Sequence, residues 1–131
     1  PWRGPGMTEA LIIGAGPAGL MAAEVLAGAG LHVTVAEAMP SPGRKFLMAG
    51  KSGLNITRDD SAEAFVAACA PCPPAMAAAL RGFGPAQVMD WARGLGQPVF
   101  TGTSGRVFPV AMKASPLLRA WLRRLESIGV R

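Results

Sequence analysis

Three closely spaced glycines after a short apolar run constrain the fold of this chain more than any other feature. Gly14, Gly16 and Gly19 follow the apolar residues 10–13 at the G-x-G-x-x-G spacing. This spacing is typical of a buried parallel strand that turns sharply into a helix and binds a dinucleotide pyrophosphate. We expect Gly14 to permit the turn, Gly16 to leave room for the pyrophosphate, and Gly19 to let the helix pack closely on the strand.

The residues between and after these glycines predict a helix from Pro17 to about Ala27. Proline suits the first helical turn, because its missing N–H would have had no partner there. The remaining unpaired N–H groups and the positive end of the helix dipole favour a phosphate at this end. We therefore include Ala15, Pro17 and Ala18 in the predicted binding loop.

A second predicted strand and an acidic residue give the glycines a specific context. Residues 31–36 alternate and are β-branched, which is typical of a parallel strand. Glu37 ends this strand 18 residues after Gly19, where a carboxylate accepts hydrogen bonds from ribose hydroxyls and repels the 2′-phosphate of NADP. The alternative is an Ala/Gly-rich helical hairpin without a ligand. His32 is interpreted as a strand-edge residue rather than a catalyst.

Length and composition indicate a small globular domain. The chain has 131 residues, of which 50% are hydrophobic and 16% are charged. It contains fewer predicted strands than a usual dinucleotide-binding domain, and Val130 resembles the start of another strand. We expect the N-terminal piece of a longer enzyme. Residues 1–6 are expected to be extraneous or a disordered arm, with Met7 as the natural start.

The net charge of +5 comes largely from a basic C-terminal helix. Without interleaved aromatic residues or a known motif, this helix favours a solvated face over a nucleic-acid site. Residues 11–30 carry one charge, but glycines and a proline interrupt the stretch, so no membrane segment is predicted. The sequence also lacks a convincing targeting signal. We expect a cytoplasmic protein that binds neither nucleic acid nor membrane.

The two cysteines form a C-x-x-C motif, Cys69 and Cys72. This spacing is compatible with a redox pair or with half of a metal site. Neighbouring prolines place the motif in a helix-breaking linker, and the chain has no second C-x-x-C. Neither a redox role nor a metal site is therefore predicted.

The segment 44–57 has paired cations, glycines and little periodicity, so it is predicted to be a loop. Arg44 and Lys45 would bind an anionic ligand there, unless the segment is an ordinary solvated basic loop. Downstream, the pattern predicts helices and one β-hairpin. The predicted helices are 62–69 with Ser61 as N-cap, 74–81, 85–95, and Pro116 to about Ile128 with Ser115 as N-cap; the hairpin strands are 99–101 and 106–108.

Three runs of the sequence resemble one known family. GAGPAGLMAAEVLAGAG, VTVAEAMPSPGRKFLMAGKSGLNIT and GTSGRVFPVAMKASPLLRAWLRRLESIGV resemble the N-terminal part of BaiN-like flavoproteins. These are NAD(P)/FAD-dependent oxidoreductases of the aminoacetone-oxidase type. The resemblance extends from Met7 to Arg131 and is less diagnostic over about 59–97. Leu54 stands where other members carry a cysteine, so no role of that thiol is carried over.

The resemblance implies an α/β fold: a Rossmann-like FAD-binding βαβ unit with parallel strands, followed by helices and a β-hairpin. Residues 7–131 would be the N-terminal part of an incomplete FAD-binding domain that lacks the substrate domain and the C-terminal FAD segment. Arg106 and Phe108 would approach the flavin and the substrate. The cofactor-binding residues would be Gly14, Ala15, Gly16, Pro17, Ala18, Gly19, Glu37, Arg44, Lys45 and Asn55, the last three along the pyrophosphate and ribityl chain.

The predicted function is the FAD-binding portion of a flavin-dependent oxidoreductase, inactive by itself. NAD(P)H would be the electron donor of the whole enzyme, and its substrate an unidentified small molecule. No motif specifies a catalytic acid or base. Two alternatives remain open: an NAD-binding Rossmann module, because the glycines and Glu37 suit NAD equally well, and a non-catalytic interaction fragment.

Overall fold

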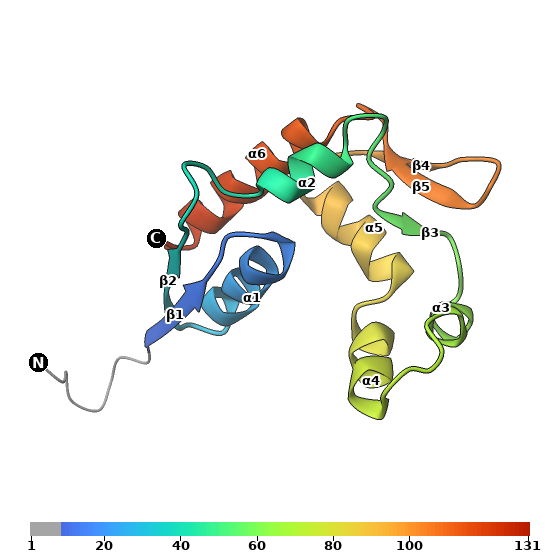
Figure 1. Ribbon diagram of the computed structural model, residues 1–131, viewed down its shortest axis with the longest axis horizontal. Helices are drawn as coiled ribbons and strands as arrows, with labels where there is room; N and C mark the ends of the chain where they lie inside the picture. The colour runs from blue at the N-terminus through green and yellow to red at the C-terminus, as the bar shows by residue number, and fades with distance from the viewer. Residues whose placement is uncertain (1–8) are drawn as a thin grey trace, which may run out of the picture. The chain divides into compact units, whose positions relative to one another are not determined.

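The computed structural model describes residues 9–131, which form two compact units (Figure 1). Unit 1 contains residues 9–49 and 118–131, and unit 2 contains residues 50–117. The predicted arm of residues 1–6 and the predicted start at Met7 lie outside the described residues.

Unit 1 is built on the predicted strand–helix–strand element. Strand β1 (Glu9–Ile13) leads into helix α1 (Pro17–Gly28), which returns the chain to strand β2 (His32–Ala36). The two strands pair in parallel, from Glu9 opposite His32 to Ile13 opposite Ala36. The predicted parallel βαβ unit is therefore confirmed.

Helix α1 covers one face of this two-stranded sheet. Helix α1 lies on the face that carries Ile12 and Val33, and Val33 is almost fully buried. On the other face, Leu11 is 66% exposed and Ile13 is 79% exposed. The expectation of a buried first strand was therefore wrong for this face, because none of the described residues covers it.

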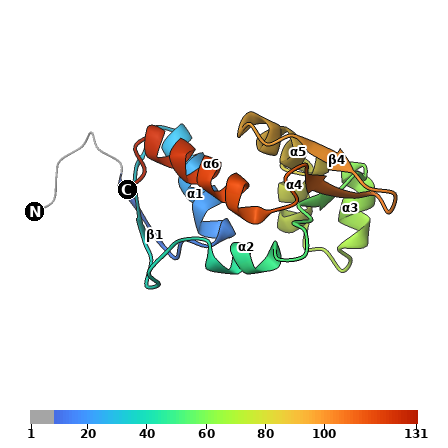
Figure 2. The same cartoon turned by 90° about the horizontal axis from the view of Figure 1, so that it is seen from above.

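Helix α6 (Ala114–Ser127) packs beside α1 through its residues in unit 1 (Figure 2). Glu24 of α1 accepts hydrogen bonds from the Trp121 indole Nε1 at 2.6 Å and from the Arg124 guanidinium at 2.8 Å. The helix begins two residues earlier than predicted, so Ser115 lies within its first turn and is not the N-cap.

A short helix, α2 (Arg44–Ala49), occupies the start of the segment that was predicted to be a loop. Gly43 has a φ of +67° and its carbonyl accepts the first bond of this helix from the Leu47 N–H. Phe46 packs edge-on against Trp121, with ring centroids 6.4 Å apart. A six-residue helix is too short to display a 3.6-residue period, and the prediction failed for this reason.

Arg131 extends the sheet pattern beyond β2. Its N–H donates to the Val33 carbonyl at 3.1 Å, and its carbonyl accepts from the Val35 N–H at 2.7 Å. Both bonds flank Thr34, as in a parallel ladder. Residues 130–131 form no strand of their own, so the predicted strand at this point stays a prediction that these two bonds support.

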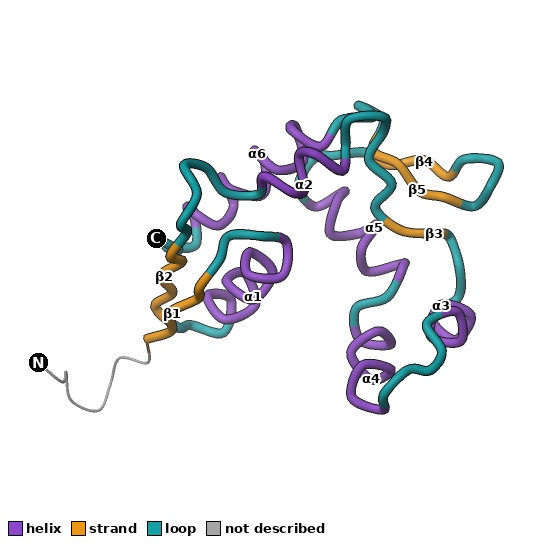
Figure 3. Tube along the Cα trace, in the orientation of Figure 1, coloured by secondary structure: helices purple, strands orange, loops and turns teal. Residues whose placement is uncertain are grey.

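Unit 2 is a small antiparallel sheet with three helices (Figure 3). The predicted hairpin is present and consists of β4 (Val99–Thr101) and β5 (Arg106–Pro109). Ser61 caps α3 (Ala62–Ala68), as predicted, by accepting the Ala64 N–H at 3.2 Å. The third strand, β3, was not predicted, since two residues cannot show alternation; it pairs with β5. The elements are β3 (Thr57–Arg58), α3 (Ala62–Ala68), α4 (Pro74–Gly82), α5 (Pro85–Gly94), β4 (Val99–Thr101) and β5 (Arg106–Pro109).

No helix within residues 9–131 is both long enough and apolar enough to cross a membrane.

Candidate functional site

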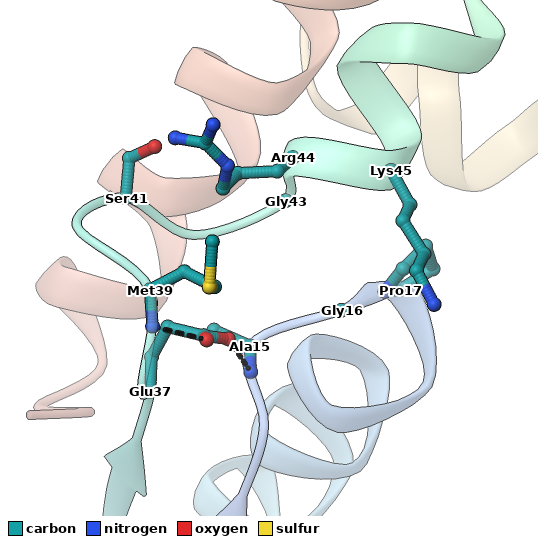
Figure 4. Close-up of a pocket in the computed structure, with 9 residues that line it drawn as sticks. All are labelled: Ala15, Gly16, Pro17, Glu37, Met39, Ser41, Gly43, Arg44 and Lys45. Atoms are coloured by element: carbon teal, nitrogen blue, oxygen red, sulfur yellow. Dashed lines mark hydrogen bonds between the residues drawn. The ribbon is translucent and has the colours of Figure 1, made fainter.

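A pocket of about 250 Å³ in unit 1 lies where the glycine turn, the end of β2 and the start of α2 meet (Figure 4). All three contributing segments are turns or element ends, as expected for a ligand site at the carboxyl ends of parallel strands. Its lining residues are Ala15, Gly16, Pro17, Glu37, Met39, Ser41, Gly43, Arg44 and Lys45.

Each glycine of the turn has a different local requirement. Gly14 has a φ of +100°, which other residues rarely adopt, and its N–H donates to the Ala36 carbonyl at 2.7 Å. A Cβ on Gly19 would overlap the Gly14 carbonyl oxygen and lie 3.3 Å from the Ile12 side chain. A Cβ on Gly16 would meet nothing within 4 Å. Gly14 and Gly19 are thus required by the fold, whereas Gly16 leaves open space at the pocket.

The amino end of α1 contributes backbone N–H groups beside the pocket. Gly16 is the N-cap residue and no side chain caps this end. The first intrahelical bond runs from the Leu20 N–H to the Gly16 carbonyl at 2.9 Å. The N–H groups of Ala18 and Gly19 therefore have no intrahelical acceptor, and the first turn contains no acidic residue. This end of the helix is electrostatically suited to an anion.

Glu37 lies at the end of β2 with its carboxylate against the glycine turn. One oxygen accepts the Met39 N–H at 2.8 Å and the other accepts the Ala15 N–H at 2.7 Å. These two hydrogen bonds, first that of Met39 and then that of Ala15, lower the pKa of the Glu37 carboxyl below its usual value, against a smaller opposing effect of desolvation. The side chain is exposed and is therefore ionised at neutral pH.

The segment after Glu37 is tied back to the glycine turn. The Gly43 N–H donates to the Ala15 carbonyl at 2.8 Å, and a Cβ on Gly43 would lie 2.7 Å from a Leu118 methyl carbon. Arg44 and Lys45 follow directly as the first residues of α2, and both side chains are exposed. Within the described part of the chain, neither cation forms an ion pair.

Six of the ten predicted cofactor-binding residues line this pocket together. Gly14, Ala18 and Gly19 shape the turn without lining the pocket. Sequence reasoning missed three lining residues, Met39, Ser41 and Gly43. The proline- and glycine-rich stretch 38–43 marked a turn, but nothing in it indicated that the chain folds back onto Ala15. The six that line it are Ala15, Gly16, Pro17, Glu37, Arg44 and Lys45.

Asn55, the tenth predicted residue, belongs to unit 2. Its side-chain amide donates to the Thr57 carbonyl at 2.7 Å and to the Val107 carbonyl at 3.1 Å. Asn55 therefore supports the pairing of β3 with β5, and its cofactor contact stays a prediction. Phe108 packs on Phe100 of the neighbouring strand with ring centroids 5.8 Å apart.

The C-x-x-C motif lies in the connection between α3 and α4, as predicted. Cys69 is exposed, Cys72 is half-buried, and both are free thiols. Among residues 9–131, no group of three or more His, Cys, Asp or Glu side chains is arranged to hold a metal ion.

The chemistry of the pocket suits a phosphorylated ligand that also carries hydroxyl groups. Backbone N–H groups and two cations favour phosphate oxygens, and the ionised Glu37 accepts hydrogen bonds from hydroxyls. The open space at Gly16 leaves room for the ligand close to the backbone.

Comparisons with known proteins agree with this fold. The crystal structure of Thermovibrio ammonificans THI4 superposes with a TM-score of 0.56 at 18% sequence identity. The match covers 95% of this chain and 37% of the THI4 chain, so this chain spans little more than a third of that protein's length. No curated protein matches the sequence. The sequence model of the HI0933-like protein Rossmann domain matches residues 8–131. The chain therefore belongs to the HI0933-like Rossmann-domain family.

Proposed function

We propose that this chain is the FAD-binding portion of a flavin-dependent oxidoreductase. The glycine turn and the amino end of α1 hold the FAD pyrophosphate, and Glu37 holds the hydroxyls of the adenosine ribose. Membership of a Rossmann-domain family and the composition of the pocket both support this assignment.

The observation that carries the proposal is the position of Glu37. Its carboxylate ends β2 and accepts the Ala15 N–H, so an ionised acceptor stands directly beside the pyrophosphate-binding turn. A dinucleotide carries its ribose hydroxyls next to its phosphates and needs both features within one pocket. The same negative charge disfavours a ligand with a 2′-phosphate.

When bound, FAD supplies the redox chemistry that protein side chains lack. The residues of this chain bind and orient it: the amides at the amino end of α1 and Lys45 face phosphate, and Glu37 faces ribose. For the whole enzyme we propose NAD(P)H as the electron donor and a small molecule as the substrate. The activity is proposed for the whole enzyme and not for this chain, because the chain spans only 37% of the length of the THI4 chain that shares its fold.

The test uses a substitution that fills the pocket without disturbing the fold. Gly16→Val places a branched side chain where a Cβ meets no protein atom, so the fold should persist and FAD binding should be lost. Gly28→Val is the matched control, because a Cβ there also meets nothing and the residue lies at the far end of the same helix. FAD affinity is measured by titration, following the shift of the flavin absorption bands and the quenching of flavin fluorescence.

Three results would contradict the proposal. One is a failure of the unsubstituted chain to bind FAD after reconstitution. Another is equal FAD affinity of the Gly16→Val and Gly28→Val variants. A third is tighter binding of NAD than of FAD, which would identify an NAD-binding Rossmann module instead.

A further inference from the structure

The two neighbouring cations of α2 extend toward different parts of the pocket. In Figure 4 the Arg44 guanidinium extends toward Ser41, whereas the Lys45 side chain extends toward Pro17. Consecutive residues of an α-helix project roughly 100° apart, so a single ligand group does not face both side chains equally. Arg44 and Lys45 can therefore contact two different groups of a ligand rather than the same group.

Lys45 extends toward the part of the pocket that is built for phosphate. Pro17 is the first residue of α1, whose amino end carries no side-chain cap and no acidic residue. An ammonium group is a compact charge with three rotatable donors, which can pair with phosphate oxygens from many directions. The lysine and the helix end therefore act on the same anionic group.

Arg44 extends toward a different wall, which contains Met39 and Ser41. Met39 is 52% exposed, and its side chain lies between Glu37 and Arg44 in Figure 4. A planar guanidinium stacks on aromatic bases, and a polarisable thioether also makes favourable contacts with aromatic rings. This wall suits a flat, uncharged ring better than it suits a second phosphate.

We infer that Lys45 binds the pyrophosphate of the ligand and that Arg44 stacks on its purine base. The ribose, held at Glu37, connects the two groups. This inference rests on the proposed function and deepens it, since it identifies the ligand class as a purine nucleoside diphosphate, of which FAD is a derivative. It also divides two roles that the sequence assigned jointly to the pyrophosphate and ribityl chain.

The test compares ADP with CDP, which share the diphosphate and ribose but differ in the size of the base. Binding of both to the full chain is measured by calorimetry. Arg44→Lys keeps the charge and removes the planar group, so the preference for ADP over CDP should fall about fivefold. Lys45→Gln removes the charge at similar length, so both ligands should weaken by roughly tenfold and the preference should stay unchanged.

Two further variants control for charge. Lys45→Arg restores a cation at that position and should return both affinities to near the original values. Arg119→Gln removes an exposed cation of α6 that does not line the pocket and should change neither affinity.

The outcomes separate this inference from the proposed function. If the unsubstituted chain binds neither ADP nor FAD, the proposed function itself is wrong. If it binds both, the division of roles is overturned by any of three results: no original preference for ADP, an unchanged preference in Arg44→Lys, or an altered preference in Lys45→Gln.

Discussion

The two units of the chain use their polar groups differently. In unit 1, the amides of α1 and the cations of α2 surround a pocket, and Glu37 is the only acidic residue that lines it. In unit 2, charged side chains meet each other on the surface: Arg58 pairs with Asp60, Arg81 with Glu63, and Arg93 with Asp90. Unit 1 thus keeps donors available beside its pocket, whereas these three arginines of unit 2 are each paired with a nearby carboxylate.

The glycine turn of unit 1 offers the strongest way to test this comparison. Gly19→Ala forces a Cβ against the Gly14 carbonyl, so the free energy of unfolding should fall by roughly 3 kcal/mol, near the upper end for overpacking. Gly16→Ala is the control, and should change stability by under about 0.5 kcal/mol. Urea unfolding, combined with hydrogen exchange of the β1 and β2 amides, measures both. An equal decrease in the free energy of unfolding in the two variants would contradict the close contact between Gly19 and the Gly14 carbonyl.

The ion pairs of the two units give the next largest expected difference. Glu24 is 17% exposed and holds both Trp121 and Arg124, so Glu24→Gln should lower the free energy of unfolding by about 2 kcal/mol. The matched variant in unit 2 is Glu63→Gln. The Glu63 side chain is 72% exposed, and its partner Arg81 stays hydrated when the ion pair is lost, so the loss of stability should be small. Thermal unfolding should show a clear decrease for the first variant and a much smaller one for the second. A larger effect at Glu63 would reverse the comparison.

The smallest expected effect is a difference in how two carboxyls respond to pH and salt. The pKa of Glu37 is lowered by backbone amides, whereas the pKa of Glu63 is lowered by the hydrogen bond and charge of Arg81. Since both values are depressed, each group contributes its full stabilisation above its ordinary value of 4.5 and loses it as the pH falls through the lowered pKa. Added salt should raise the pKa of Glu63 toward its ordinary value and leave that of Glu37 nearly unchanged.

Side-chain carboxyl resonances followed by NMR between about pH 2 and pH 6, at low and high salt, measure this difference. The amide resonances of Ala15 and Met39 should titrate together with Glu37. An equal salt response of the two carboxyls would contradict the assignment of their different causes.

The sequence predicted the elements that have strong local signals. Gly14 needs a positive φ, Gly19 has no room for a Cβ, and Gly16 leaves space open at the pocket. Their spacing predicted the turn and the parallel strand pair around it. Prolines and glycines marked the ends of the helices in unit 2. The errors concern short elements: α2 and β3 contain too few residues to display a period.

The other differences depend on tertiary contacts that have no local signal. Met39 and Ser41 line the pocket only because Gly43 bonds to Ala15, which is distant in sequence. The exposure of Leu11 and Ile13 likewise depends on which face of the sheet α1 covers. Neither result follows from residue type or spacing.

The bond between Gly43 and Ala15 also sets a constraint on length. Ala15 forms one hydrogen bond to each end of this segment: its N–H donates to the Glu37 carboxylate, and its carbonyl accepts the Gly43 N–H. Residues 38–42 therefore form a loop whose two ends are both fixed at Ala15. One inserted residue would have to bulge outward or displace α2, and a displaced α2 would carry Arg44 and Lys45 out of register with the turn. The number of residues between Glu37 and Gly43 therefore determines the position of α2 relative to the glycine turn. Insertions should be tolerated far less here than in other exposed turns of this chain.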